Sequence, residues 1–158
     1  MNVEMSFVNT DNREALLVQV ASRLRAPPDS PGKQPDWGLS SSYDVLLAPE
    51  RKRKVAVSPV QNGWVALVES KEVIDFAFLQ FVGDTFKTDV VAIQVSDVGG
   101  AGGHALYRAG IVQEKYFSED DDDPLANARS CLRKIGIPFD ILTFREAIQL
   151  RSTGWAIL

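Results

Sequence analysis

The chain of 158 residues carries a formal net charge of -4, and its pI is about 5.0. This length suffices for one domain with its own core, and the acidic balance argues against a nucleic-acid partner, which needs a clustered positive surface. The single cysteine, Cys131, cannot form an internal disulfide, and no long apolar run predicts a membrane span, so we expect one cytoplasmic domain without a membrane partner.

The N-terminal part predicts a strand, a helix and a long loop. The strand runs from Met5 to Val8, and Asp11 then opens a helix, with Glu14 completing a capping box. Apolar residues recur at helical spacing and are expected to face the core: Leu16, Leu17, Val20, Ala21 and Leu24. The segment 26–42, rich in proline, glycine and serine around Trp37, predicts a loop.

The middle of the chain predicts three strands, over 45–48, 54–58 and 64–70. Residues 64–70, "WVALVES", are apolar on both faces, which is typical of a central strand. The basic run 51–54 precedes the second of these strands, and we interpret it as a solvated strand entrance and not as a nucleic-acid patch.

A helix is expected over 71–87, capped by Ser70, and its apolar residues cover nearly its whole circumference. Such a helix is buried on several sides or docked on a partner. The helix therefore predicts a homodimer, with the segment around Trp37 or the C-terminal tail around Trp155 as alternative covers.

The stretch "SDVGGAGGHALYRAG", residues 96–110, follows a predicted strand over 89–95 and contains the only histidine, His104. It matches neither a Walker-type phosphate loop nor a dinucleotide fingerprint. It leads into a strand, turns at Ala109-Gly110 and returns as a strand over 111–117, so no helix N-terminus lies over the glycines. The pattern favours a bulged or bent strand with close backbone packing over an anion site.

Four segments resemble a group of uncharacterised bacterial proteins: "SFVNTDNREALL", "VSPVQNGWVALVES", "DVVAIQVSDV" and "ALYRAGIVQEKYFSED". The resemblance implies an α+β fold and brings no catalytic motif. Members of that group tend to have an acidic residue where this chain has Ala109. In size and acidic character the chain is also loosely similar to toxin-immunity proteins, which implies a protein partner.

The acidic run 119–123 ends in Asp123-Pro124, a strong helix start, and Gly136 is expected to end that helix. Its apolar face comprises Leu125, Ala128, Leu132 and Ile135, with Cys131 at the rim as a small, inert side chain. No calcium-loop pattern follows the acidic run, so we expect no metal or other cofactor. A last helix is expected from Thr143, and the tail "GWAIL" is a candidate edge strand.

These elements predict an α+β fold with a mostly antiparallel sheet of six or seven strands and three or four helices. The first functional hypothesis is an immunity-like interaction module that binds a basic partner surface through Asp120, Asp121 and Asp122. The second is a small-ligand domain with a cleft near Trp37, Trp64 and Tyr107. The third, and least favoured, is a hydrolase centred on His104, with Ser96 and Asp97 as possible partners.

Overall fold

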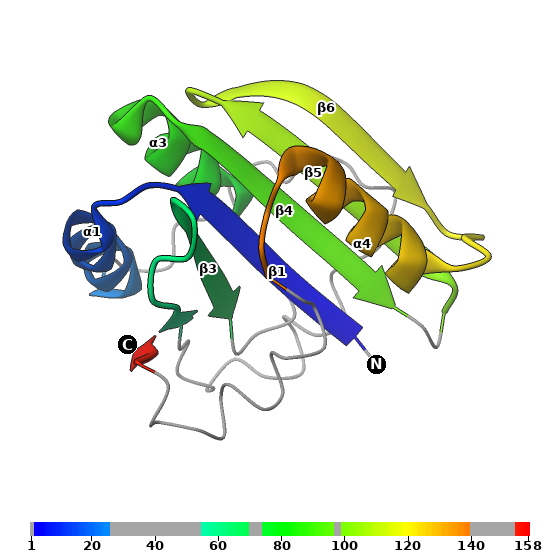
Figure 1. Cartoon of the computed structure of the whole chain (residues 1–158), viewed down its shortest axis with the longest axis horizontal. Coiled ribbons are helices and arrows are strands. Elements are labelled where there is room, and N and C mark those ends of the chain that lie inside the picture. The colour runs from blue at the N-terminus through cyan, green and yellow to red at the C-terminus, as the bar shows by residue number, and fades with distance from the viewer. Residues whose placement is uncertain (1, 26–54, 70–73, 97–98, 140–153) are drawn as a thin grey trace.

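One antiparallel sheet organises the molecule. The computed structural model describes residues 2–25, 55–69, 74–96, 99–139 and 154–158. Its seven strands lie in the order β6-β5-β4-β1-β3-β2-β7, and every neighbouring pair is antiparallel (Figure 1). The strands are β1 (Asn2–Asn9), β2 (Val55–Val57), β3 (Trp64–Glu69), β4 (Asp89–Ser96), β5 (Ala101–Arg108), β6 (Ile111–Ser118) and β7 (Ala156–Ile157). The α+β prediction is confirmed.

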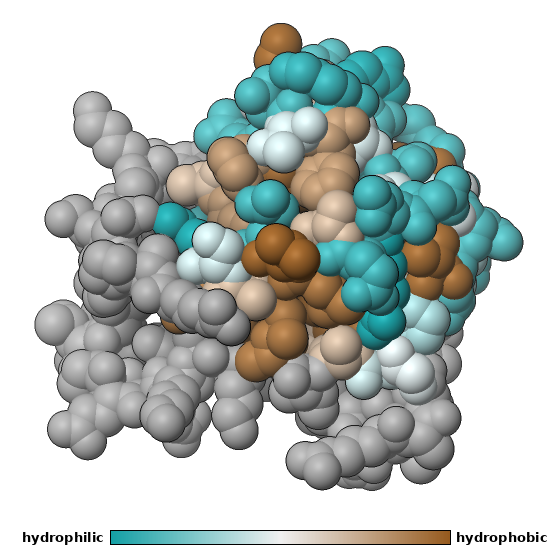
Figure 2. All heavy atoms as spheres, turned by 90° about the vertical axis from the view of Figure 1, so that its left-hand side faces the viewer, coloured by the Kyte–Doolittle hydropathy of each residue, from teal (hydrophilic) through white to brown (hydrophobic). Residues whose placement is uncertain are grey.

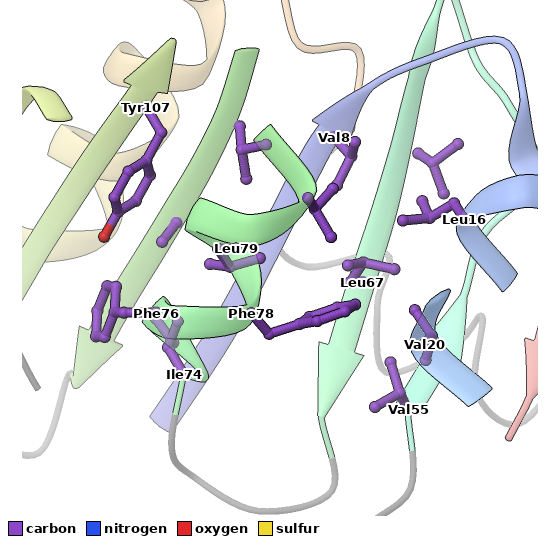
Figure 3. Close-up of a cluster of buried hydrophobic side chains, with 14 of the residues drawn as sticks. Val8, Leu16, Val20, Val55, Leu67, Ile74, Phe76, Phe78, Leu79 and Tyr107 are labelled. Carbon is purple, nitrogen blue, oxygen red and sulfur yellow. The ribbon is translucent and has the colours of Figure 1, made fainter. Parts of the chain in front are cut away.

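Three helices cover the two faces of the sheet within the described residues: α1 (Arg13–Arg25), α3 (Phe76–Phe86) and α4 (Pro124–Ile135). Because successive strand residues point to opposite faces, the strands contribute to two separate cores. One core packs against α1 and α3 and includes Leu16, Phe78 and Tyr107 (Figure 3). The other packs against α4, which lies over β4 and β5 (Figure 1). None of these helices is long and apolar enough to cross a membrane.

Two helix starts differ from the sequence prediction. Helix α1 is capped by Asn12, whose Oδ1 accepts a hydrogen bond from the Ala15 amide at 3.1 Å, and not by Asp11. Helix α3 starts at Phe76, because Asp75 accepts the Phe78 amide at 3.0 Å and interrupts the expected helix over 71–87. The Asp75 carboxylate also pairs with Arg23 of α1, so the start of α3 is fixed by a tertiary contact.

The expected C-terminal edge strand is confirmed as β7, which pairs with β2. The Arg13 guanidinium joins the tail to the sheet, because it donates to the carbonyl oxygens of Gly154 at 2.8 Å and Ser58 at 2.7 Å. The predicted elements around Trp37, at 45–48 and from Thr143 lie outside the described residues, as does the basic run 51–54.

Most of the apolar circumference of α3 is buried within the chain. Its side chains Phe76, Phe78, Leu79 and Val82 are buried, largely against the sheet. On another side, Gly83 meets the β5–β6 turn so closely that a Cβ there would lie 2.9 Å from the Gly110 nitrogen. Phe81 is about half exposed. The helix therefore offers a second copy of the chain far less apolar surface than its sequence indicates.

Two tight turns have left-handed backbone at both central residues. Asn62 and Gly63 connect Gln61 to Trp64 with φ of 48° and 77°, and Ala109 and Gly110 join β5 to β6 with φ of 47° and 79°. These angles fit type I′ turns, which favour Asn-Gly. Ala109 is therefore strained, because its Cβ disfavours the left-handed region.

Replacing Ala109 with asparagine is expected to raise the free energy of unfolding by about 0.5 to 1 kcal/mol, since asparagine tolerates this conformation better. Urea denaturation measures the change. Asn62→Ala is the converse control and should lower stability by a similar amount. A loss of stability in Ala109→Asn would contradict the assignment of strain to this residue.

Candidate interaction surface

The acidic run between β6 and α4 is anchored by a buried aspartate. Asp121 is only 8% exposed, and its amide donates to the Gly100 carbonyl oxygen at 2.6 Å. Its Oδ1 accepts hydrogen bonds from the Asp123 amide at 3.1 Å and the Asn127 side chain at 2.7 Å. Its Oδ2 is buried without a hydrogen-bond partner among the described residues. Asp123 in turn caps α4 by accepting the Ala126 amide at 2.9 Å.

This anchoring leaves Glu119, Asp120 and Asp122 exposed, and we call these three residues the acidic turn. The sequence hypothesis treated Asp120, Asp121 and Asp122 as one binding surface. That hypothesis is wrong for Asp121, because its carboxylate faces inward and holds the loop in shape. The exposed carboxylates are therefore presented by a turn with a defined internal hydrogen-bond pattern.

Asp121→Ala is expected to lower the free energy of unfolding by about 1 to 3 kcal/mol, because it removes the acceptor of the Asp123 and Asn127 donors. Asp121→Asn keeps an acceptor oxygen and should cost less. Thermal and urea denaturation compare the two variants. Equal stabilities for Asp121→Ala and the wild type would show that the carboxylate does not anchor the turn.

The glycine stretch brings β5 close to its neighbours, as expected. A Cβ at Gly102 would lie 2.8 Å from the Pro124 Cβ and 3.2 Å from the Asp121 Oδ2, so this glycine lets α4 and the acidic turn approach the sheet. A Cβ at Gly103 would lie 2.7 Å from the backbone carbonyl oxygen of Tyr116 in β6. The expected bulge is not at these glycines, whose pairing with both neighbouring strands is regular.

The register shift lies further along, between Leu106 and Tyr107, and it reorients the side chains of β6. Val112 pairs with Tyr107, which belongs to the core under α1 and α3. Glu114 pairs with Leu106, which packs against the core under α4. Val112 and Glu114 therefore lie on opposite faces of the sheet although they are two residues apart.

Apolar side chains are exposed along β6, beside the acidic turn. Ile111, Val112 and Tyr116 are 67%, 46% and 44% exposed, and all six residues from Ile111 to Tyr116 are exposed. This β6 surface continues into the acidic turn at the C-terminal end of the strand. On the α1 side of the molecule, Figure 2 also shows apolar side chains among hydrophilic ones, and Val18 of α1 is 65% exposed.

His104 lies on the α4 face of β5 and contacts two residues of β6. Its Nε2 lies 3.0 Å from the Glu114 Oε1, and its ring centroid is 5.7 Å from that of Tyr116. The hydrogen bond with His104 lowers the pKa of Glu114, and electrostatic interactions with His104 and Lys134 lower it further. Burial and the nearby Glu114 raise the pKa of the Cys131 thiol, so this partly buried cysteine stays protonated at neutral pH.

The expected catalytic trio is not assembled. His104 of β5 pairs with Ile93 of β4, so these two side chains share one face of the sheet. Ser96 lies three residues after Ile93 on β4, so its side chain is on the opposite face. Asp97 lies outside the described residues. Among the described residues, no three histidine, cysteine or acidic side chains are placed to hold a metal ion.

The expected aromatic cleft is also not formed by its described members. Trp64 is buried in the core under α4, and Tyr107 is buried in the core under α1 and α3, so the sheet separates them. Burial raises the pKa of Tyr107 to about 12, and the phenol stays neutral at physiological pH. Trp37 lies outside the described residues.

Comparisons of the chain with models of protein families, with curated proteins and with solved structures find no match. Of the candidate residues named from the sequence, Asp120 and Asp122 belong to the exposed acidic turn, and His104 contacts Glu114 of the neighbouring β6. The exposed β6 side chains and Glu114 could not be identified from the sequence, because residues 111–118 carry only a generic strand pattern.

Proposed function

We propose that the chain is a protein-interaction module that binds a basic, partly apolar surface of a partner protein through the acidic turn and β6. One observation carries the proposal: the exposed Glu119, Asp120 and Asp122 are presented by a turn that Asp121 anchors from inside. A preorganised turn loses little conformational entropy on binding. Clustered carboxylates also attract and orient a cationic partner, and an immunity-like protein would bind its partner in this way.

The position of the turn supports the same function. Exposed Tyr116 pairs with His104 on the α4 face of the sheet, and the acidic turn connects β6 to α4, so an aromatic side chain lies on the face toward which the turn leads. Aromatic side chains are frequent anchors of protein interfaces, and acidic side chains at their rim increase the association rate and its salt dependence. We propose a cytoplasmic setting for this interaction, in keeping with the single cysteine.

Neutralisation of the turn tests the proposal. The variant Glu119→Gln/Asp120→Asn/Asp122→Asn removes three exposed charges, and the control Asp11→Asn/Glu14→Gln/Asp84→Asn removes three exposed charges elsewhere. Each protein is immobilised, exposed to lysate of cells that naturally express the chain, and eluted with salt. We expect the wild type and the control to retain a common basic protein that the turn variant loses. Retention of the same proteins by all three would contradict the proposed function.

A homodimer through α3 is a separate proposal and rests on Phe81, which is about half exposed. Light scattering at micromolar concentration tests it. A mass of twice 17.4 kDa supports the dimer, and a mass of 17.4 kDa across the dilution range contradicts it.

A further inference from the structure

The backbone of β6 offers a second recognition element beside its side chains. β6 is outermost in the sheet order and pairs with β5 as its neighbour. Its first six residues are exposed on both faces of the sheet, which is the pattern of an edge strand open to solvent. Such a strand presents backbone donors and acceptors with which an extended segment of another protein can pair.

The charges of β6 disfavour a second copy of this chain as that segment. In a two-fold antiparallel pair, one residue of the strand lies opposite its own copy. In the two registers of greatest overlap, which pair seven of the eight residues of the strand, that residue is Glu114 or Lys115. Like charges directly opposite each other destabilise strand pairing. The strand is thus better suited to a segment of different sequence.

The two faces of β6 specify what that segment carries. On the face of α1 and α3, Val112 offers an apolar contact beside Lys115, which disfavours a basic side chain there. On the face of α4, Glu114 offers a carboxylate beside Tyr116. A strand added beside β6 has side chains that alternate between these faces. Apolar residues alternating with lysine or arginine therefore match both, and the acidic turn at the end of β6 adds three further carboxylates.

We propose that the partner binds by strand addition, with an extended segment of alternating apolar and basic residues paired to the outer edge of β6. This inference rests on the proposed function and specifies how the same surface recognises its partner. Main-chain hydrogen bonds would contribute affinity, and the two unlike faces would contribute specificity.

Two synthetic octapeptides test the inference on the wild-type protein: one alternates valine with lysine, and the control has four valines followed by four lysines. We expect the alternating peptide to bind more tightly in a fluorescence anisotropy titration. It should also slow hydrogen exchange of the β6 amides. Equal binding of the two peptides, or unchanged exchange in β6, would overturn strand addition.

The variant Val112→Glu separates strand addition from simple charge attraction. If the apolar face is used, this exposed substitution weakens binding of the alternating peptide by about fivefold. If attraction between charges alone were responsible, the added carboxylate would leave binding unchanged or strengthen it, and the inference would be overturned. In that case, loss of the basic lysate protein on neutralising the acidic turn would still support the proposed function. The comparison of peptides on the wild type stands even where Val112→Glu folds poorly.

Discussion

Replacing Gly110 with alanine is expected to lower the free energy of unfolding by about 3 kcal/mol. Two costs combine at this residue. Its φ of +79° is a conformation that alanine rarely adopts, and an added Cβ would lie 2.8 Å from the Asp84 Cβ and 2.9 Å from the Gln80 oxygen. The Gln80 oxygen belongs to the backbone of α3, so relief requires a shift of the whole helix against the β5–β6 turn.

Gly136→Ala provides the matched control, because Gly136 has a similar φ of +83° and nothing lies within 4 Å of its added Cβ. It should cost about 1 kcal/mol, the conformational part alone. Urea denaturation of both variants measures the difference. Equal losses would mean that α3 and the turn do not pack as closely as described.

The second large effect is expected at Leu16, which is fully buried between α1 and the sheet. Leu16→Ala should lower the free energy of unfolding by about 3 kcal/mol, through lost apolar burial and the cavity that remains. Val18→Ala removes a side chain from the exposed side of the same helix and should change stability by less than about 0.5 kcal/mol. Similar losses in both variants would contradict the orientation of α1.

The strands and helices could be predicted because burial repeats along the sequence. The run from Trp64 to Glu69 is apolar on both faces, and it forms a strand with neighbours on both sides and a core on each face. The helix starts were harder to predict. Asp11 and Asn12 are both good caps, and hydrogen-bond geometry alone selects Asn12. The start of α3, which Asp75 caps, further depends on Arg23, 52 residues away from Asp75.

The candidate surface could be predicted only in part. The acidic run itself is plain in the sequence, but Asp120, Asp121 and Asp122 have identical propensities. Only contacts with Gly100 and Asn127, from two other parts of the chain, turn Asp121 inward. Likewise, no local sequence pattern predicts the register shift that places Val112 and Glu114 of β6 on opposite faces of the sheet.

The most direct test of the proposed surface is photo-cross-linking from inside it. Benzoylphenylalanine is placed at Tyr116 on β6, and in a control protein at Val18 on α1, both of which are exposed. Each protein is irradiated in lysate of cells that naturally express the chain, with the acidic turn intact or neutralised. We expect one partner to be cross-linked from Tyr116 only when the acidic turn is intact, and not from Val18. Equal cross-linking from both positions, or cross-linking from Tyr116 that ignores the acidic turn, would contradict binding through β6 and the acidic turn.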